Sequence, residues 1–576
     1  MMGRFPYENE IQQLVSLLIN HYQISRKLLI RLVGEEKYNN IKSVLSELGE
    51  GDLTNEMLAR MIVVDRGAEL FSGSSETIRE LRIFLLKQIS EEHLMQLYER
   101  NPASGRKIQS LNYIPRVLAE KPWKSGKQWP RDFVKVLKFP LVYAGIAAER
   151  NHEVSEIFDI EPRKKVPDLV EYQVGLKEKM LEVLNREQDK TRCIVTLPTG
   201  GGKTRVAVES FIDWLQPRFA EGKYLIWIAQ GEELCEQAIA CIADMWQERE
   251  FTDSLRVYRY FGGKQVSTDD LIGGAVIASI QQIVSRIKNG DEALNEILLN
   301  CGAMIIDEAH HAVADSYNQL FTKAKQLVGE DLFPICGLTA TPGRNFDQTS
   351  GLVDQFDAYL IRPELPNNRK YEENPLLYFR EKGYLATPEF VLLDSDEEVI
   401  ITDDYFEESG DLDREFLQVL AEDETRNLKI IEYMISLPSN SSVLVYSCTV
   451  KHAEFLCTVM NSMGFKAAFV SASTPKHVRR MYIKAFKNKE IQFLFNYGVL
   501  TTGFDAPKVD HLLICRPTSS IVLYEQMVGR GLRGKLFGGT ETCKIVDFST
   551  NIKTHGKPLA YARFIREWEL EKKVGV

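Results

Sequence analysis

A glycine-rich loop that runs into a lysine and a threonine is the part of the chain whose residue types most directly suggest chemistry. Residues 197–204 read LPTGGGKT, after the apolar run Cys193–Thr196 and before a helical pattern. Consecutive glycines let backbone N–H groups turn toward an anion without clashes from Cβ atoms. A strand, such a loop and a helix together are typical of a phosphate-binding loop. The residues expected to bind the phosphates of a nucleotide are Thr199, Gly200, Gly201 and Gly202.

The end of this loop and a later acidic pair supply the groups that ATP hydrolysis needs. Lys203 would carry positive charge to the β- and γ-phosphates, and Thr204 a hydroxyl to Mg²⁺. Residues 304–311 read MIIDEAHH, an apolar strand that ends in acids. Asp307 is suited to hold Mg²⁺, and Glu308 to accept a proton from the water that attacks the γ-phosphate. Two acids after a strand are usually an exposed strand end, but their place downstream of the loop favours catalysis. The pattern predicts an ATP hydrolase whose metal ligands are Thr204 and Asp307.

The residues before this loop read as helices separated by short breaks. Ser75 and Ser90 are candidate N-caps, each followed by apolar residues at helical spacing. No alternation typical of strands occurs there. We expect an all-α N-terminal accessory domain over residues 1–155.

From about residue 165 short apolar runs alternate with amphipathic helices, which is the pattern of a parallel α/β sheet. The expected strands of a first lobe are Cys193–Thr196, Tyr224–Ala229, Ala275–Ser279, Ala303–Ile306 and Ile335–Leu338. Those of a second lobe are Ser442–Tyr446, Ala467–Val470, Gln492–Asn496, His511–Cys515 and Lys544–Asp547. We expect two tandem α/β domains over 165–345 and 426–555, a linker or insertion over 346–425 with acidic runs, and a C-terminal tail helix over 556–576.

The loop and the DEAHH sequence resemble those of the superfamily 2 helicases and translocases of the DExH kind. Further segments resemble that family's motifs in the same order: EYQ at 171–173, AQGEEL at 229–234, ASIQQ at 278–282, LTATP at 338–342, VLVY at 443–446, TTGFDAP at 501–507 and QMVGRGLR at 526–533. The sequences of these motifs are most similar to those in the motor of type I and type III restriction enzymes. The departures are Gln230, Ser279 and Met527, each at a place where the family usually has another residue.

This resemblance implies two RecA-like domains with ATP between them. It implies that Arg530 and Arg533 reach the γ-phosphate from the second lobe, where an arginine is worth about 10³–10⁵ in rate. It further implies that Gln526 belongs to the catalytic set, that Gln173 reads adenine, and that Gly503 and Asp505 belong to the nucleotide site.

The segment 106–138 is basic inside an acidic protein. It holds nine Lys and Arg residues against Glu120 and Asp132, a net charge of +7, with Tyr113, Trp123 and Trp129 interleaved. Cations for phosphates and rings for stacking are typical of a nucleic-acid surface. The alternatives are that the tryptophans anchor a core, that the lysines are merely solvated, or that the segment docks an acidic partner. Residues 123–129 read as an exposed loop.

Composition excludes several classes of protein. With 44% hydrophobic and 26% charged residues, the chain of 576 residues can bury several cores. Nine cysteines without a C-x-x-C pair indicate core thiols in a reducing cytosol and no zinc site. The N-terminus does not resemble a signal peptide, and no apolar run is long enough for a membrane span. We expect a cytoplasmic protein without a membrane partner. Its net charge of −10 argues against nucleic acid unless the binding surface is local.

Two functional hypotheses remain open. The first is an ATP-dependent DNA helicase or translocase, the motor of a bacterial antiviral-defence or restriction-type system, with DNA favoured over RNA and a nuclease or other defence subunit as protein partner. The second is a nucleic-acid-stimulated ATPase that acts as a sensor or clamp and recruits a partner without separating strands. Both use the same ATP-site residues.

Overall fold

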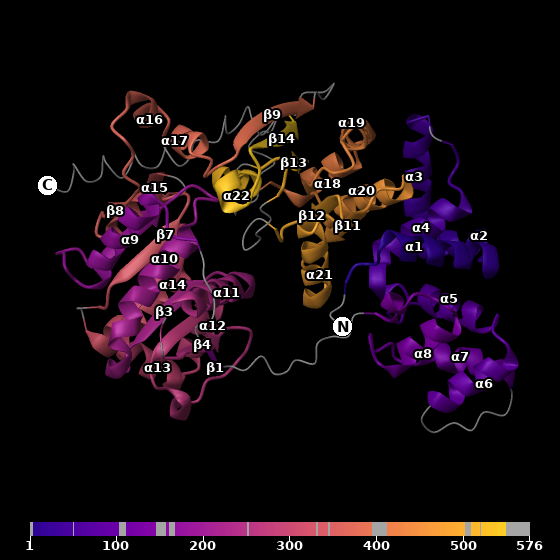
Figure 1. The fold of residues 1–576 in the computed structure, drawn as a ribbon, viewed down its shortest axis with the longest axis horizontal. Coiled ribbons are helices and arrows are strands. Elements are labelled where there is room, and N and C mark those ends of the chain that lie inside the picture. The colour runs from indigo at the N-terminus through magenta and orange to yellow at the C-terminus, as the bar shows by residue number, and fades with distance from the viewer. Residues whose placement is uncertain are drawn as a thin grey trace.

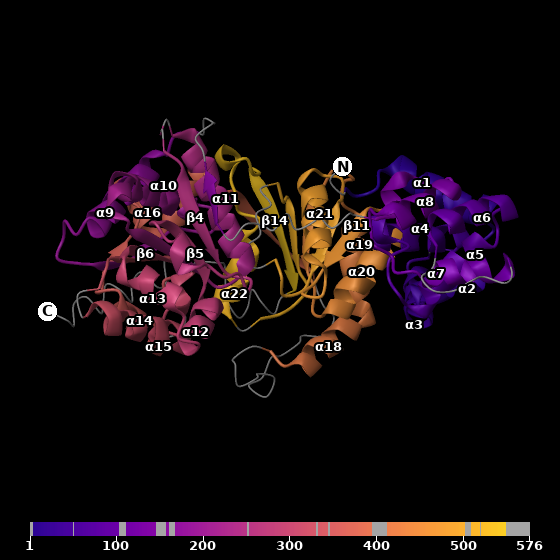
Figure 2. The ribbon, with the colours of Figure 1, turned by 90° about the horizontal axis from the view of Figure 1, so that it is seen from below.

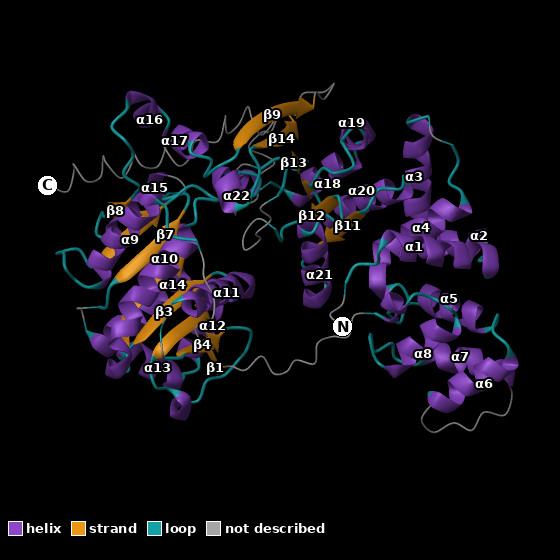
Figure 3. Cartoon of the chain, in the orientation of Figure 1, coloured by secondary structure: helices purple, strands orange, loops and turns teal. Residues whose placement is uncertain are grey.

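The fold is taken from a computed structural model. It describes residues 4–49, 51–102, 111–145, 157–160, 167–249, 251, 253–329, 332–343, 346–393, 412–500, 508–518 and 520–548. Three bodies follow one another in the views of Figures 1 and 2: a first α/β lobe, a second α/β lobe, and a group of helices from the N-terminal region. Helices cover the strands of both lobes (Figure 3). The two α/β lobes and the helical N-terminal region confirm the predicted fold class.

The N-terminal region is helical, as its sequence predicts. Its α-helices are α1 (Glu8–Ser16), α2 (Arg26–Val33), α3 (Glu35–Glu47), α4 (Asn55–Arg66), α5 (Glu76–Leu86), α6 (Glu91–Arg100), α7 (Ile114–Glu120) and α8 (Gln128–Val136). The two predicted N-caps are confirmed, because Ser75 Oγ accepts from the N–H of Ile78 at 3.4 Å and Ser90 Oγ from that of His93 at 3.3 Å.

The first lobe is built on a sheet with the order β1-β4-β5-β3-β6-β7-β2-β8, parallel except for β1 against β4. Its elements are β1 (Ile157–Ile160), α9 (Glu171–Leu184), β2 (Arg192–Thr196), α10 (Lys203–Leu215), β3 (Tyr224–Ala229), α11 (Glu232–Glu248), β4 (Leu255–Tyr260), β5 (Gly274–Ser279), α12 (Ile280–Lys288), α13 (Glu292–Leu299), β6 (Cys301–Asp307), α14 (Asp315–Val328), β7 (Ile335–Thr339), α15 (Phe346–Gln355) and β8 (Leu360–Ile361). The five predicted strands are present. Two separate apolar clusters contain the core of this lobe.

The second lobe holds a parallel sheet with the order β11-β12-β10-β13-β14-β9. Its elements are β9 (Thr387–Leu393), α18 (Arg414–Glu422), α19 (Glu424–Ile435), β10 (Val443–Tyr446), α20 (Val450–Ser462), β11 (Ala467–Val470), α21 (Lys476–Lys487), β12 (Phe493–Asn496), β13 (His511–Ile514), α22 (Ile521–Gly529) and β14 (Thr542–Phe548). Two short helices precede them, α16 (Arg369–Glu373) and α17 (Pro375–Glu381), and pack against the core of the first lobe. The five predicted strands of the second lobe are also present.

The segment 346–425 does more than join the lobes. Its residues Thr387–Leu393 form β9, which pairs in parallel with β14 and extends the second sheet. The exposure of alternate residues of β9 is that of an edge strand, so the segment lacks the continuous apolar run that marks the central strands. The expected tail helix over 556–576 lies outside the described residues.

The N-terminal helices pack against the second lobe, although the chain continues from them into the first. One continuous apolar cluster includes Leu58 and Ile62 of α4 together with Leu456 and Met460 of α20. Both views place these helices beside α20 and α21 and away from the first sheet (Figures 1 and 2). The N-terminal region and the second lobe therefore share a core.

The tryptophans of the basic segment belong to this core. Trp129 is buried at the start of α8, and its ring meets that of Trp123 edge-on at 6.3 Å between centroids. Phe71 and Phe133 complete the cluster. The interpretation of residues 123–129 as an exposed loop with rings for stacking is wrong for both tryptophans, because their rings are core anchors.

The remaining composition-based expectations concern thiols, metals and membranes. The nine cysteines are unpaired thiols, and all but Cys241 are buried. Within the described ranges there is no group of three or more His, Cys, Asp or Glu side chains placed to hold a metal ion. Among the helices that the structure describes, none is both long enough and apolar enough to span a membrane.

Candidate functional site

The glycine-rich loop lies between β2 and α10 and has the backbone that a phosphate cradle requires. Gly200 and Gly202 have φ values of +87° and +84°, which side-chain-bearing residues rarely adopt. The N–H of Gly201 donates to the carbonyl of Pro198 at 2.9 Å and closes the turn. Gly202 is the N-cap of α10, so the first turn of that helix opens toward the loop. An anion in the loop would meet the positive end of the helix.

The loop is supported from behind by two side chains of α9. The hydroxyl of Tyr172 donates to the carbonyl of Gly201 at 2.8 Å, and Nε2 of Gln173 donates to the same oxygen at 3.2 Å. The N–H of Val170 donates to Oε1 of Gln173 at 3.2 Å. Gln173 is 1% exposed. Both the oxygen and the nitrogen of its carboxamide therefore bind groups of the protein itself. Recognition of adenine by Gln173 stays a prediction.

The two acids of the predicted pair follow β6 directly. Asp307 is buried, and its Oδ1 accepts from the N–H of Glu308 at 3.0 Å. Burial and the adjacent carboxylate of Glu308 raise the pKa of Asp307 to about 7. Glu308 has a φ of +51°, an unusual conformation for a residue with a side chain and one that is typical of functional sites.

Opposite and like charges converge on the loop lysine. Nζ of Lys203 donates to the carbonyl of Leu197 at 3.2 Å. Burial lowers the pKa of Lys203, while the carboxylates of Glu308 and Asp307 act against that shift. Arg530 lowers the same pKa, so its charge is also felt at Lys203. The structure thus brings together the loop lysine, the acidic pair and one arginine of the second lobe.

These residues fit Mg²⁺ and a nucleotide. The carboxylate of Asp307 is buried and its pKa is raised, so a divalent cation beside it would stabilise its charged form. Asp307 supplies a carboxylate oxygen and Thr204, at the start of α10, a hydroxyl. Mg²⁺ is commonly held by one or two protein oxygens together with phosphate oxygens and waters.

The second lobe meets the glycine loop directly. A Cβ added at Gly529, at the end of α22, would lie 2.4 Å from the side chain of Thr199. A Cβ added at Gly200 would lie 3.6 Å from the Cα of Arg533 and 3.3 Å from Leu385. The segment that carries Arg530 and Arg533 therefore closes one side of the nucleotide site.

Gln526 lies on α22, one turn before Arg530, and is partly exposed. Gly503 and Asp505 lie outside the described residues, so their assignment stays a prediction.

Sequence reasoning missed a hydrogen-bonded connection from the acidic pair to β7. Nδ1 of His310 lies 3.4 Å from Oε2 of Glu308 and 2.9 Å from Oγ1 of Thr339. That hydroxyl donates to the carbonyl of Thr341 and accepts from its N–H. The residues involved lie in the sequences DEAHH and TAT, but only the pairing of β6 with β7 brings them within hydrogen-bonding distance.

The linker also reaches the loop, through aromatic rings. Tyr172 meets Phe379 of α17 at 5.2 Å and Tyr384 at 5.1 Å between ring centroids. Tyr384 stacks on Phe537 of the second lobe at 5.6 Å. Tyr172, whose hydroxyl binds the carbonyl of Gly201, thus contacts the segment that joins the lobes through its ring.

Two protein-family models match the chain. Residues 167–344 match the family described as the res subunit of type III restriction enzymes. Residues 426–535 match the family described as the helicase conserved C-terminal domain.

Two curated proteins illustrate the similarity. IRC3 of Saccharomyces cerevisiae, whose description is that of an ATP-dependent helicase, is 28% identical over 369 residues, which cover 63% of this chain and 49% of that protein. The type I restriction enzyme EcoKI endonuclease subunit of Escherichia coli is 23% identical over 375 residues, which cover 59% of this chain and 31% of the subunit. The chain spans about half the length of the yeast relative.

Solved structures include an HsdR subunit fragment of a type I restriction enzyme from Vibrio vulnificus, with a TM-score of 0.49 and 18% identity over 69% of this chain and 67% of that one. Dbp5 of S. cerevisiae bound to RNA and ADP BeF3 has a TM-score of 0.44 and 14% identity over 69% of this chain and 93% of that one.

Proposed function

Because the chain belongs to the superfamily 2 DExH helicases related to restriction-enzyme motors, a class of ATP-hydrolysing enzymes, we propose that it is an ATP-dependent motor that moves along or unwinds DNA. The observation that carries the proposal is the contact between Gly529 and Thr199, which joins the second lobe to the glycine loop of the first. A nucleotide held there would contact both lobes, so its hydrolysis would change how they meet.

The chemistry follows from the residues around the loop. The N–H groups of the loop and Lys203 bind the phosphates, and Glu308 accepts the proton of the attacking water. Arg530 and Arg533 offset charge that develops on the γ-phosphate. Thr204 and Asp307 would hold Mg²⁺, which would further neutralise the charge of the phosphates.

A polar pocket of about 660 Å³ in the first lobe is suited to a phosphate backbone. It is lined by Gln230, Gly231, Glu232, Gly262, Gly263, Ser279, Gln281, Gln282, Ser285, Arg286 and Asn289, and α11 and α12 both begin at it. Two helix N-termini and backbone amides bind phosphate without large net charge. This supports nucleic acid as the substrate of a protein whose net charge is −10. The similarity to restriction-enzyme subunits favours DNA over RNA.

The test measures ATP hydrolysis and strand displacement on the same DNA substrates. We expect hydrolysis that DNA stimulates, lost in Lys203→Ala, with movement or displacement that depends on ATP. Hydrolysis without displacement or movement on any substrate would instead assign the chain to the sensor or clamp class. Absence of stimulation by any polynucleotide would contradict the proposal.

We further propose that the motor serves a restriction-type or antiviral-defence system with a nuclease as protein partner, by analogy with the restriction-enzyme subunits. Phage plating on cells that carry the chain with its natural neighbours tests this. Protection that Lys203→Ala abolishes is expected, and equal plaque counts with and without the chain would contradict it.

A further inference from the structure

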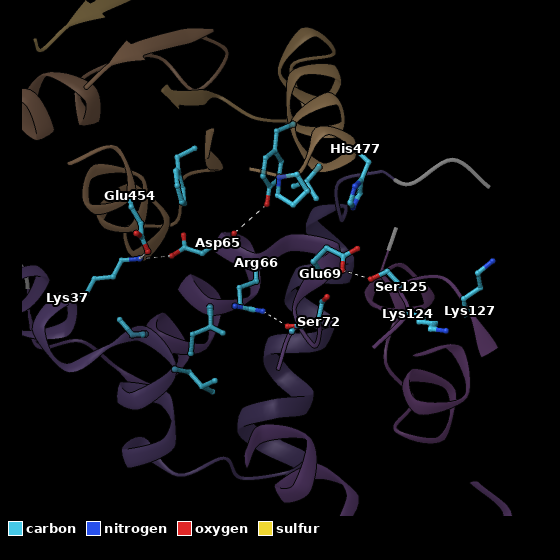
Figure 4. Close-up of a pocket in the computed structure, with 18 residues that line it drawn as sticks. Lys37, Asp65, Arg66, Glu69, Ser72, Lys124, Ser125, Lys127, Glu454 and His477 are labelled. Carbon is cyan, nitrogen blue, oxygen red and sulfur yellow. Dashed lines mark hydrogen bonds and ion pairs between the residues drawn. The ribbon is translucent and has the colours of Figure 1, made fainter. Parts of the chain in front are cut away.

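A cavity lies where the N-terminal helices meet the second lobe. It measures about 800 Å³ and is lined by residues of α4, of the loop before α8, and of α21 (Figure 4). The three carboxylates at this cavity bind neighbouring groups. Glu454 and Asp65 pair with Lys37 at 2.9 and 3.4 Å, and Oε2 of Glu69 accepts from the hydroxyl of Ser125 at 2.5 Å.

Two lysines and a histidine at the same cavity are left without such partners. Lys124 and Lys127 from the N-terminal region and His477 from the second lobe are exposed and line it. Their side chains make no hydrogen bond or ion pair with any described residue. Figure 4 shows the two lysines and His477 on the same side of the cavity.

An exposed basic face begins at His477 and continues along α21. The sequence of this helix, KHVRRMYIKAFK, contains no acid. His477, Arg480, Lys484 and Lys487 are exposed and spaced by three, four and three residues, which places them on one face of the helix. The opposite face buries Met481, Tyr482 and Phe486 in the shared core. The ten steps along the helix from His477 to Lys487 span about 15 Å at 1.5 Å per residue.

From Lys127 a second face continues along α8. Lys124, Lys127, Arg131 and Lys135 are exposed and spaced by three, four and four residues. The same helix buries Trp129, Phe133 and Val134, so the core fixes which way the cations point. Lys127 is the N-cap of α8 and His477 lies in the first turn of α21, and both line the cavity, so the two faces meet there.

We propose that the exposed faces of α21 and α8, joined across the cavity, form one cationic track for the phosphate backbone of double-stranded DNA. The proposal rests on the proposed function and extends the DNA path from the lobes onto the N-terminal helices. At one phosphate per 3.4 Å along each strand, the face of α21 alone matches about four phosphates.

The surroundings of the track favour a duplex backbone over other anionic partners. Single strands are usually held by stacking of bases on exposed aromatic rings, whereas the rings of Trp123 and Trp129 pack in the core. Protein interfaces usually centre on apolar anchors. Of the large apolar side chains that are exposed in the described chain, none lies within 124–135 or on α21.

The test compares two double variants with the same change of charge. Lys127→Gln/Arg131→Gln removes two cations of the track. Lys27→Gln/Lys87→Gln removes two exposed cations of the same helical region that do not line the cavity. Binding of a blunt duplex is measured by fluorescence anisotropy between about 50 and 200 mM salt, where the slope of log affinity against log salt changes by about 0.9 per phosphate contact.

We expect the track variant to bind the duplex about tenfold more weakly, with a salt slope lower by about two. The control variant should bind as the wild type does, and all three proteins should hydrolyse ATP at the same basal rate without DNA. An unchanged slope in the track variant would overturn the track. An equal loss of single-strand binding, or a loss confined to an acidic polypeptide such as polyglutamate, would overturn the assignment to duplex DNA. If the wild type binds no polynucleotide, the proposed function itself fails.

Discussion

Asp65 of the N-terminal helices and Asn461 of the second lobe are hydrogen-bonded although 396 residues separate them in sequence. Nδ2 of Asn461 donates to Oδ1 of Asp65 at 2.8 Å, and the hydroxyl of Thr458 donates to Oδ2 at 2.9 Å. The same asparagine accepts from the N–H of Ala467 and donates to its carbonyl, and so it also anchors the start of β11. One amide thus joins the N-terminal region to the edge of the second sheet.

Asp65→Ala should destabilise the protein by about 2–3 kcal/mol, because it removes one acceptor of a buried amide and one of a buried hydroxyl and weakens the pairing of Lys37. Urea unfolding followed by tryptophan fluorescence measures this. Asp52→Ala is the matched control, since Asp52 pairs with Lys42 at 3.3 Å on the surface, and it should change stability by less than about 0.5 kcal/mol. Equal effects of the two substitutions would contradict a structural role of Asp65.

Glu308→Gln should lower the rate of ATP hydrolysis by about 10²–10⁴-fold while ATP still binds, because the amide cannot accept the proton of the attacking water. Single-turnover hydrolysis and binding of a fluorescent ATP analogue separate the two effects. Glu292→Gln, an exposed change on α13, should leave both unchanged. Normal turnover in Glu308→Gln would remove this residue from the site.

Arg530→Ala should lower hydrolysis by about 10³–10⁵-fold, and Arg530→Lys should not restore it, because a point charge does not reproduce the planar guanidinium. Steady-state rates with and without DNA measure the loss. Lys535→Ala removes a nearby cation that pairs with Glu541 on the surface and should have no effect. A rate in Arg530→Lys close to that of the wild type would contradict the proposed contact with the γ-phosphate.

Gly202→Ala should weaken ATP binding by at least about tenfold. The new Cβ would lie 2.5 Å from Nε2 of Gln173, at a φ of +84° that alanine rarely adopts. Gly222→Ala is the control, since Gly222 also has a positive φ but open space around it. It should cost about 1 kcal/mol of stability and leave ATP affinity unchanged. Isothermal titration with ATP distinguishes the two.

Stability should fall in acid because of His452. This side chain is buried, with Nδ1 accepting from the N–H of Cys448 at 3.2 Å and Nε2 lying 2.9 Å from Oδ1 of Asn427. Burial lowers its pKa from 6.5 to about 3. Between these two pH values the unfolded chain therefore binds a proton at His452 that the folded protein does not bind. The contribution of His452 to the free energy of unfolding is fully present above about pH 6.5 and is lost as the pH falls toward 3.

The loss due to His452 should approach about 1.4 kcal/mol per pH unit within that window. Urea unfolding at several pH values, compared between the wild type and His452→Gln, isolates it from the carboxylates. Parallel pH profiles of the two proteins would show that His452 does not contribute.

The sequence was sufficient to predict the central strands and the residue types of the proposed ATP site. Central strands such as Tyr224–Ala229 are continuous apolar runs because both faces of a parallel sheet are covered. The glycine loop and the acidic pair lie at strand ends that parallel pairing brings to one edge, so their proximity follows from the pattern.

What the sequence could not supply depends on contacts between distant segments. The sequence of β4 contains Arg256 and Arg259 and is therefore not typical of a buried strand. It forms one because it pairs with β5. The docking of α4 on α20 rests on apolar surfaces and one amide that no local pattern connects. The direction of the cations on α8 likewise follows from the burial of Trp129 and Phe133. From the sequence alone, Trp129 could be either a core anchor or a ring for stacking.

The N-terminal region is fixed to one lobe and covalently continuous with the other. Its described part ends at Gly145, and β1 of the first sheet begins at Ile157. Twelve peptide units between these two Cα atoms can span at most about 43 Å. That length limits how far the first lobe can move from the N-terminal region, and because this region is docked on the second lobe, it forms a second connection between the lobes besides the segment 346–425.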